Sequence, residues 1–164
     1  MSNESAFLLA NALVFPQWML MMVAPRWFVT QWLTRKLVIP ALLAVLYAYY
    51  LFTSTGGSLD FMTFATLKGV MTLFQQGGER VMLAGWIHYL AFDLVAGCWI
   101  LRDAKRYEIA HAWLIPCLLF CFMLGPIGLL LYVLVRGTKP HPDSKSSSAT
   151  SKQGRPRLRG EIPG

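Results

Sequence analysis

The segment VMLAGWIHYLAFDLVAGCWIL, residues 81–101, decides the fold class of this chain. Its length suits one bilayer crossing, since a helix needs about 20 apolar residues to span the hydrocarbon core. Asp93 is the one charged residue in the segment. An ionised carboxylate at the centre of a membrane helix costs about 2.5 to 3.5 kcal/mol, so it is expected to be paired, protonated or functional. The segment therefore predicts a membrane helix that carries a candidate site.

Three more stretches of the 164-residue chain have the length and composition of a membrane span. They cover residues 6–24, 37–55 and 109–135, and none contains Lys, Arg, Asp or Glu. The link RDAKRYE before residue 109 is short, so the third and fourth spans are expected to be antiparallel neighbours. The sequence thus predicts the all-α class, as an integral membrane four-helix bundle. Its even number of crossings would leave both termini on the same side.

The rest of the chain predicts an interfacial helix and a tail. Residues 61–76 are too polar to span easily but repeat large apolar side chains at helical spacing, which is typical of an amphipathic helix at the membrane interface. Residues 137–164 are rich in Ser, Pro, Lys and Arg, so we expect a disordered basic tail after a transmembrane domain of residues 1–136. A solubilising role is the simplest interpretation of this tail. Its charge suits anionic lipid headgroups, and no nucleic-acid partner is predicted.

Two polar residues inside the third span, His88 and Asp93, are candidate catalytic residues. At 1.5 Å per residue, Asp93 lies roughly 12 Å in from the end of the span at Leu101, and His88 lies deeper. Folding back through the short link would place Asp93 opposite Pro116 and His88 opposite residues 122–125 of the fourth span. Both side chains are therefore predicted to line one internal cavity between these spans.

The alternative is that both residues hold helices together. Each proline in the fourth span, Pro116 and Pro126, leaves a carbonyl of the preceding turn without its usual backbone donor. His88, or a protonated Asp93, would then donate a hydrogen bond to a freed carbonyl, as polar side chains do between membrane helices. On this interpretation neither residue takes part in chemistry.

Three further residues are predicted to bind a substrate near that cavity: His111, Trp86 and Pro126. The competing interpretations are structural, namely a histidine beside Trp113 at the interface and a tryptophan of the aromatic belt. A metal or haem site would need His88 and His111 at similar depth, which the sequence does not provide, so no metal and no cofactor is predicted. The three cysteines all lie inside spans, which argues against a disulfide framework.

Two consecutive runs carry a family resemblance: WIHYLAFDLVAGCWILRDAKRYEIAH at residues 86–111 and PCLLFCFMLGPIGLLLYVLVR at residues 116–136. Their pattern combines His88, Asp93, His111, a Cys-Leu-Leu-Phe run and Gly-Pro-x-Gly. It resembles the abscisic-acid-deficient-four family of membrane proteins, best across residues 81–136. Plant members of that family are associated with neoxanthin synthesis in chloroplast envelopes. This chain shows no transit peptide and has a basic tail, so we expect a bacterial-type, multi-pass member in the inner (plasma) membrane.

The resemblance implies action on a carotenoid or another isoprenoid lipid. Converting a carotenoid 5,6-epoxide into an allenic alcohol is an isomerisation, which requires an acid for the epoxide oxygen and a base for a polyene proton. The Asp93 carboxyl would be the acid and the His88 imidazole the base, with no redox cofactor. The rival hypothesis is a non-catalytic membrane protein that binds pigment or lipid. The expected protein partners are a second copy of the chain or an enzyme that it supports.

Overall fold

The computed structural model describes residues 2–54 and 61–139, and within these ranges the chain forms helices and no strands. The elements in chain order are α1 (Asn3–Val23), α2 (Phe28–Lys36), α3 (Val38–Ser54), η1 (Phe61–Ala65), α4 (Leu67–Gln76), α5 (Gly78–Arg106), α6 (His111–Leu124) and α7 (Pro126–Gly137). The predicted all-α class is confirmed. Of the predicted tail, residues 137–164, the structure describes 137–139, and Gly137 is the last residue of α7. The predicted disorder of residues 140–164 lies outside the described residues.

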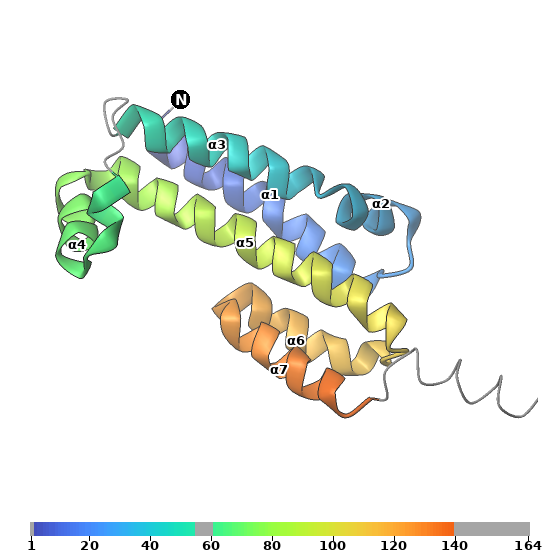
Figure 1. Cartoon of the computed structure of the whole chain (residues 1–164). Coiled ribbons are helices and arrows are strands. Elements are labelled where there is room, and N and C mark those ends of the chain that lie inside the picture. The colour runs from blue at the N-terminus through green and yellow to red at the C-terminus, as the bar shows by residue number, and fades with distance from the viewer. Residues whose placement is uncertain (1, 55–60, 140–164) are drawn as a thin grey trace, which may run out of the picture.

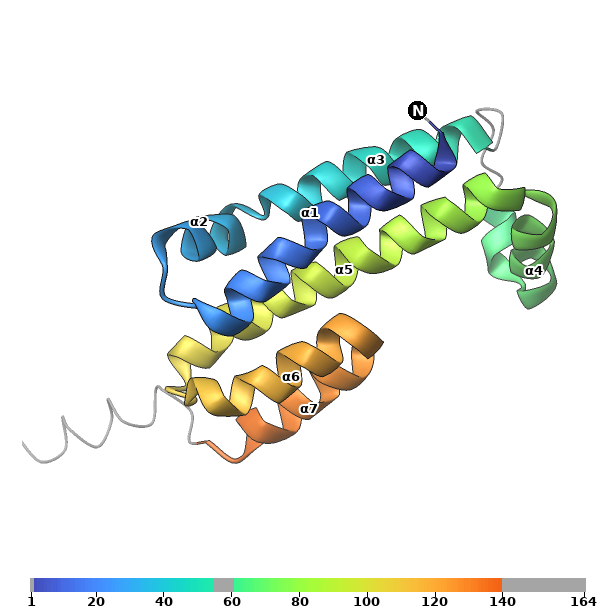
Figure 2. The same cartoon turned by 180° about the vertical axis from the view of Figure 1, so that it is seen from behind.

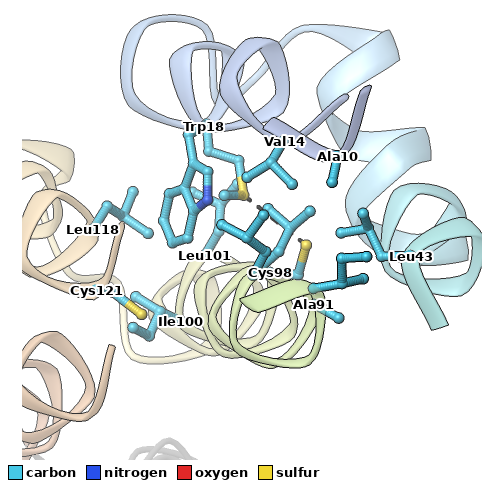
Figure 3. Packing of buried hydrophobic residues seen from close by; sticks show 14 of the residues in the cluster. Ala10, Val14, Trp18, Leu43, Ala91, Cys98, Ile100, Leu101, Leu118 and Cys121 are labelled. Carbon is cyan, nitrogen blue, oxygen red and sulfur yellow. Dashed lines mark hydrogen bonds between the residues drawn. The ribbon is translucent and has the colours of Figure 1, made fainter. Parts of the chain in front are cut away.

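Helix α5 is the centre of the fold, because it packs against helices on both sides. Helices α1 and α3 cover one side, and α6 and α7 lie on the other (Figure 1, Figure 2). Figure 3 shows how Trp18, Leu43 and Leu118 point in from α1, α3 and α6 toward the apolar surface of α5. Gly97 of α5 provides the room for Trp18, since a Cβ at this position would overlap the indole ring. The third predicted span is therefore the helix on which all the others are assembled.

The second predicted span, 37–55, corresponds to α3 and joins α2 at a sharp bend. Leu37 has a left-handed backbone conformation, with φ of 52°, and α2 and α3 meet at an angle of 42°. Pro40 lies in the first turn of α3, where its missing N–H is tolerated. Among the described residues, α1 and α5 are long and apolar enough to cross a membrane, and α2 with α3 makes a third crossing if the bent pair counts as one span.

The fourth predicted span, 109–135, is not one helix, and this prediction was wrong. Helix α6 ends at Leu124, and Gly125 then takes φ of 44° and ψ of −92°. Pro126 begins α7, which folds back along α6 as a hairpin (Figure 1). A Cβ at Gly128 would overlap the backbone of α6, so glycine at this position permits the close approach of the two helices. Gly125 and Pro126 together reverse the chain, and Gly128 lets the two helices pack closely.

Because of the hairpin, the two ends of the chain lie in other places than a straight fourth span would give. The Asn3 side chain donates to Glu79 at 3.2 Å, which places the N-terminus beside the start of α5. Arg136 pairs with Asp103 at 3.2 Å, which places the end of α7 beside the end of α5. The two described ends of the chain therefore lie at opposite ends of the long axis (Figure 2). The expectation of termini on the same side assumed a straight fourth span, and the membrane faces on which the two ends lie stay a prediction.

The predicted helix over 61–76 is present in two pieces, η1 and α4. Thr66 caps α4 by accepting a hydrogen bond from the Gly69 backbone N–H at 3.1 Å. Helix α4 buries none of its residues, and Phe74 packs over Gly85 of α5. Its location at a membrane interface stays a prediction.

Candidate functional site

The Asp93 carboxyl group lies between α5 and the turn of the α6–α7 hairpin. The residue is buried, with 9% of its surface exposed. Its carboxylate oxygens touch Gly125 so closely that a Cβ there would overlap them. Oδ2 is buried and has no hydrogen-bond partner among the described residues. Burying a carboxyl oxygen without a partner is costly, so the group is suited to holding a proton or binding a ligand rather than to stabilising the fold.

Two side chains connect this carboxyl region to the end of α6. The Tyr89 hydroxyl, one turn before Asp93, donates to the Met123 carbonyl at 3.1 Å and also interacts with the Asp93 carboxyl group. The Met123 carbonyl belongs to the last turn of α6, where helical partners are missing, so this bond satisfies an orphaned acceptor. The Cys121 thiol donates to the Asp93 backbone carbonyl at 3.7 Å. The prediction that Asp93 faces Pro116 is corrected, because the carboxyl group faces Gly125.

A large apolar groove opens where the start of α1 and helix α4 meet α5. Its volume is about 640 Å³, and its lining residues are Asn3, Glu4, Phe7, Phe74, Glu79, Met82, Leu83, Gly85, Trp86 and Tyr89. The Trp86 ring lies between Phe7 and Tyr89, with centroid distances of 5.8 and 5.6 Å. Tyr89 is therefore shared: its side chain lines the groove, and its hydroxyl lies near Asp93.

Residues 5–132 match the model of a family described as ABA DEFICIENT 4-like. The chain belongs to this family. It is also 30% identical over 140 residues to the protein ABA DEFICIENT 4, chloroplastic, of Arabidopsis thaliana, and the match covers 81% of this chain and 61% of that relative. The chain thus spans less than two thirds of the length of the curated relative. No solved structure matches it.

Membership of the ABA DEFICIENT 4-like family agrees with the resemblance found in residues 86–136, although the match extends much further toward the N-terminus. Together with the long apolar helices α1 and α5, it identifies the chain as a membrane protein. The comparisons do not support the narrower expectation of a bacterial-type member.

The structure of this ABA DEFICIENT 4-like protein separates the two predicted catalytic residues. His88 is exposed, and its ring contacts Tyr47 of α3 and Phe92, with centroid distances of 5.1 and 4.6 Å. Asp93 instead faces the hairpin. Five residues advance a helix by about 140°, which carries the second side chain to another face of α5. The two residues therefore do not line one cavity.

The three predicted substrate-binding residues also lie apart. Trp86 lines the apolar groove, whereas Pro126 is exposed at the first position of α7. His111 begins α6, and its Nε2 forms a 2.8 Å hydrogen bond with the Met22 carbonyl. Since a carbonyl can only accept, this nitrogen carries the proton, and the ring caps the C-terminal end of α1. The structure gives His111 a role in joining α6 to α1.

Sequence reasoning missed a polar cluster at the far end of α5. The Tyr132 hydroxyl donates to Asp103 Oδ2 at 2.8 Å, and Arg136 pairs with the same oxygen at 3.2 Å. Arg136 also donates to the Tyr107 hydroxyl at 2.8 Å. A straight fourth span would carry residue 132 about 35 Å along its axis away from Asp103, at 1.5 Å per residue. The cluster exists because the hairpin returns the chain, and a Tyr-Arg pair one turn apart was the available signal.

The described residues contain no group of three or more His, Cys, Asp or Glu side chains that could hold a metal ion. The three cysteines are free and buried within the helical core.

Proposed function

We propose that this protein acts on a carotenoid or another isoprenoid lipid within the bilayer, by acid–base isomerisation at Asp93. The observation that carries the proposal is a buried carboxyl group with an unpartnered oxygen, connected through Tyr89 to an apolar groove of about 640 Å³. An apolar groove of this size fits part of an elongated hydrocarbon ligand. Family membership supports the same class of substrate through the resemblance described above.

The proposed chemistry needs one proton donor and one proton acceptor. In opening an epoxide, a protonated Asp93 would give its proton to the oxygen as the C–O bond breaks, forming the alcohol. The resulting carboxylate would take a proton from the neighbouring carbon chain as the new double bond forms, so Asp93 is restored and no electrons are exchanged. Tyr89 is proposed to orient the oxygen, since this residue lines the groove and its hydroxyl interacts with the carboxyl group. His88, on another face of α5, has no part in this scheme.

Three membrane crossings and a re-entrant hairpin are proposed as the arrangement around this site. Helix α1, the α2–α3 pair and α5 have the length to cross, while α6 and α7 are short. The hairpin would enter and leave on one side and carry Gly125 into the membrane beside Asp93. Such irregular backbone is tolerated at depth where protein covers it.

The decisive experiment measures pigment composition in carotenoid-epoxide-producing cells that express the protein or its variants. Asp93→Asn keeps the shape of the side chain and removes the titratable proton, so product formation should fall to the level of cells without the gene. Cys98→Ala is the matched control, since this buried residue of α5 contacts Gln17 and Met21 of α1. Full product formation by Asp93→Asn at normal expression would contradict the catalytic proposal.

A second candidate function is pigment or lipid binding without chemistry, including support of a partner enzyme. It is favoured by the fact that Asp93 does not itself line the groove, whose walls are mostly apolar and aromatic. Expression would then leave the pigment profile unchanged, while a pigment would copurify with the protein. Replacing Trp86 with Ala should release that pigment, whereas Asp93→Asn should retain it.

A further inference from the structure

Positive charge gathers at the end of the molecule where α1 stops and α5 meets α6. The basic residues of this end are Arg26, Arg35, Lys36, Arg102, Lys105, Arg106, Arg136 and Lys139. Its acidic residues are Asp103 and Glu108, and Asp103 already pairs with Arg136. The opposite end is balanced, with Glu4 and Glu79 against Lys68 and Arg80 among the described residues. The basic end of the molecule should therefore attract anions more strongly than the opposite end does.

A cleft of about 390 Å³ lies within this basic end, and its lining residues are Pro25, Arg26, Leu101, Ala104, Lys105, Glu108, Ile109, Ala110, His111 and Leu114. Lys105 is near enough to Arg26 and Arg35 for their charges to repel its own. A bound anion would offset this repulsion.

The remaining walls of the cleft limit what that anion is. Leu101, Ile109 and Leu114 give an apolar side, and the His111 ring is fixed by its hydrogen bond to Met22. The Glu108 carboxylate also borders the cleft and reduces its net charge. One guanidinium and one ammonium group can both donate charge-assisted hydrogen bonds to the oxygens of a single phosphate group. A compact anion with several oxygens, such as phosphate, therefore fits these two cations best.

We propose that this cleft binds a phosphate group, held by Arg26 and Lys105 and strengthened by the charge of Arg35. The phosphate belongs either to a membrane lipid, whose hydrocarbon chain would lie on the apolar wall, or to a soluble phosphate compound. The site is separate from Asp93, which lies at the tip of the hairpin, while the cleft lies at its base. It does not depend on the proposed isomerisation.

The test measures the thermal unfolding midpoint of the full chain in detergent while a probe is titrated at constant ionic strength. The probes are short-chain phosphatidylglycerol and inorganic phosphate. We expect a saturable rise in the midpoint of the native protein, and an apparent Kd about tenfold weaker for Arg26→Gln/Lys105→Gln, as expected for the loss of charge-assisted hydrogen bonds. Arg106→Gln is the control, because Arg106 is a cation of the same helix end that does not line the cleft.

The two probes distinguish the sources of the phosphate. Protection by the lipid alone assigns the site to a lipid headgroup, and equal protection by inorganic phosphate assigns it to a soluble compound. No saturable effect of either probe overturns the proposal, as does an equal loss of affinity in Arg106→Gln and the double variant. If the double variant does not fold, Lys105→Gln alone decides, since removing one of the two cations that hold the phosphate should weaken binding at least about twofold. Unchanged or tighter binding in that variant would also overturn the proposal.

Discussion

The two sides of α5 are built in different ways. Toward α1 and α3 the contacts are almost wholly apolar, with Trp18, Met21 and Leu43 buried against the helix. Toward the hairpin, hydrogen bonds and a salt bridge anchor the chain at the tip and at the base. Apolar contacts tolerate small rearrangements, whereas polar contacts at two fixed points require one geometry. The hairpin side is therefore expected to be more sensitive to single substitutions.

A hairpin of α6 and α7 differs most from a straight fourth span in the membrane face on which the chain ends. An epitope tag before Ser2 and another after Lys139 should be accessible from opposite faces of the membrane, because the proposed arrangement puts three crossings between them. Antibody labelling of right-side-out and inside-out vesicles would measure this. Both tags on the same face would show that α6 and α7 cross as one span.

The second largest effect is expected from a substitution where α6 and α7 approach each other closely. Gly128→Val places side-chain atoms into the backbone of α6, so we expect the free energy of unfolding to fall by about 3 kcal/mol or more. Gly137→Val is the matched control, since a Cβ there would meet nothing within 4 Å. Denaturant titration in detergent would compare the two. Similar stability of both variants would contradict the packing of the hairpin.

The base of the hairpin depends on Asp103. Asp103→Leu removes the acceptor of the buried Tyr132 hydroxyl, and we expect a loss of roughly 2 kcal/mol in the free energy of unfolding. Asp93→Leu should cost less, because it removes a carboxyl oxygen that has no partner among the described residues. Thermal unfolding of the two variants would rank them, and the reverse order would mean that Asp93 is the structural residue.

The smallest effect is expected on the apolar side. Gln17 is buried, its Nε2 donates to the Cys98 thiol at 3.2 Å, and its Oε1 has no partner in the described chain. Gln17→Leu loses one weak bond and removes one unsatisfied acceptor, so stability should change by less than about 1 kcal/mol. A larger loss in the same unfolding assay would show that polar contacts matter on both sides of α5.

Much of the fold could be predicted from the sequence, because it depends on properties of single segments. The apolar composition of residues 81–101 predicts the central helix, and the spacing of apolar residues in 61–76 predicts a helical segment. The Gly125–Pro126 pair is compatible with either a kink or a reversal. The choice depends on contacts between distant residues, such as Gly128 against the α6 backbone and Arg136 against Asp103, which no single segment reveals.

The candidate site was predictable only in part for the same reason. The cost of a charge in an apolar helix made Asp93 notable, and the structure buries it. Its neighbours were not predictable, since the hairpin brings Gly125 to the carboxyl group. Tyr89 was overlooked because a tyrosine in an apolar helix is common, and its hydroxyl gains importance only beside Met123 and Asp93.

The hydrogen bond between His111 and the Met22 carbonyl has a consequence for the order of assembly during synthesis. The partners are 89 residues apart, so the last turn of α1 is complete only after the ribosome has made α5. At the usual rates of translation, that interval is roughly 5 to 20 seconds. Over this time the exposed carbonyl must be hydrated, which favours holding the end of α1 at the membrane surface until α6 arrives. The bond then joins the first helix to be made to the hairpin that completes the fold.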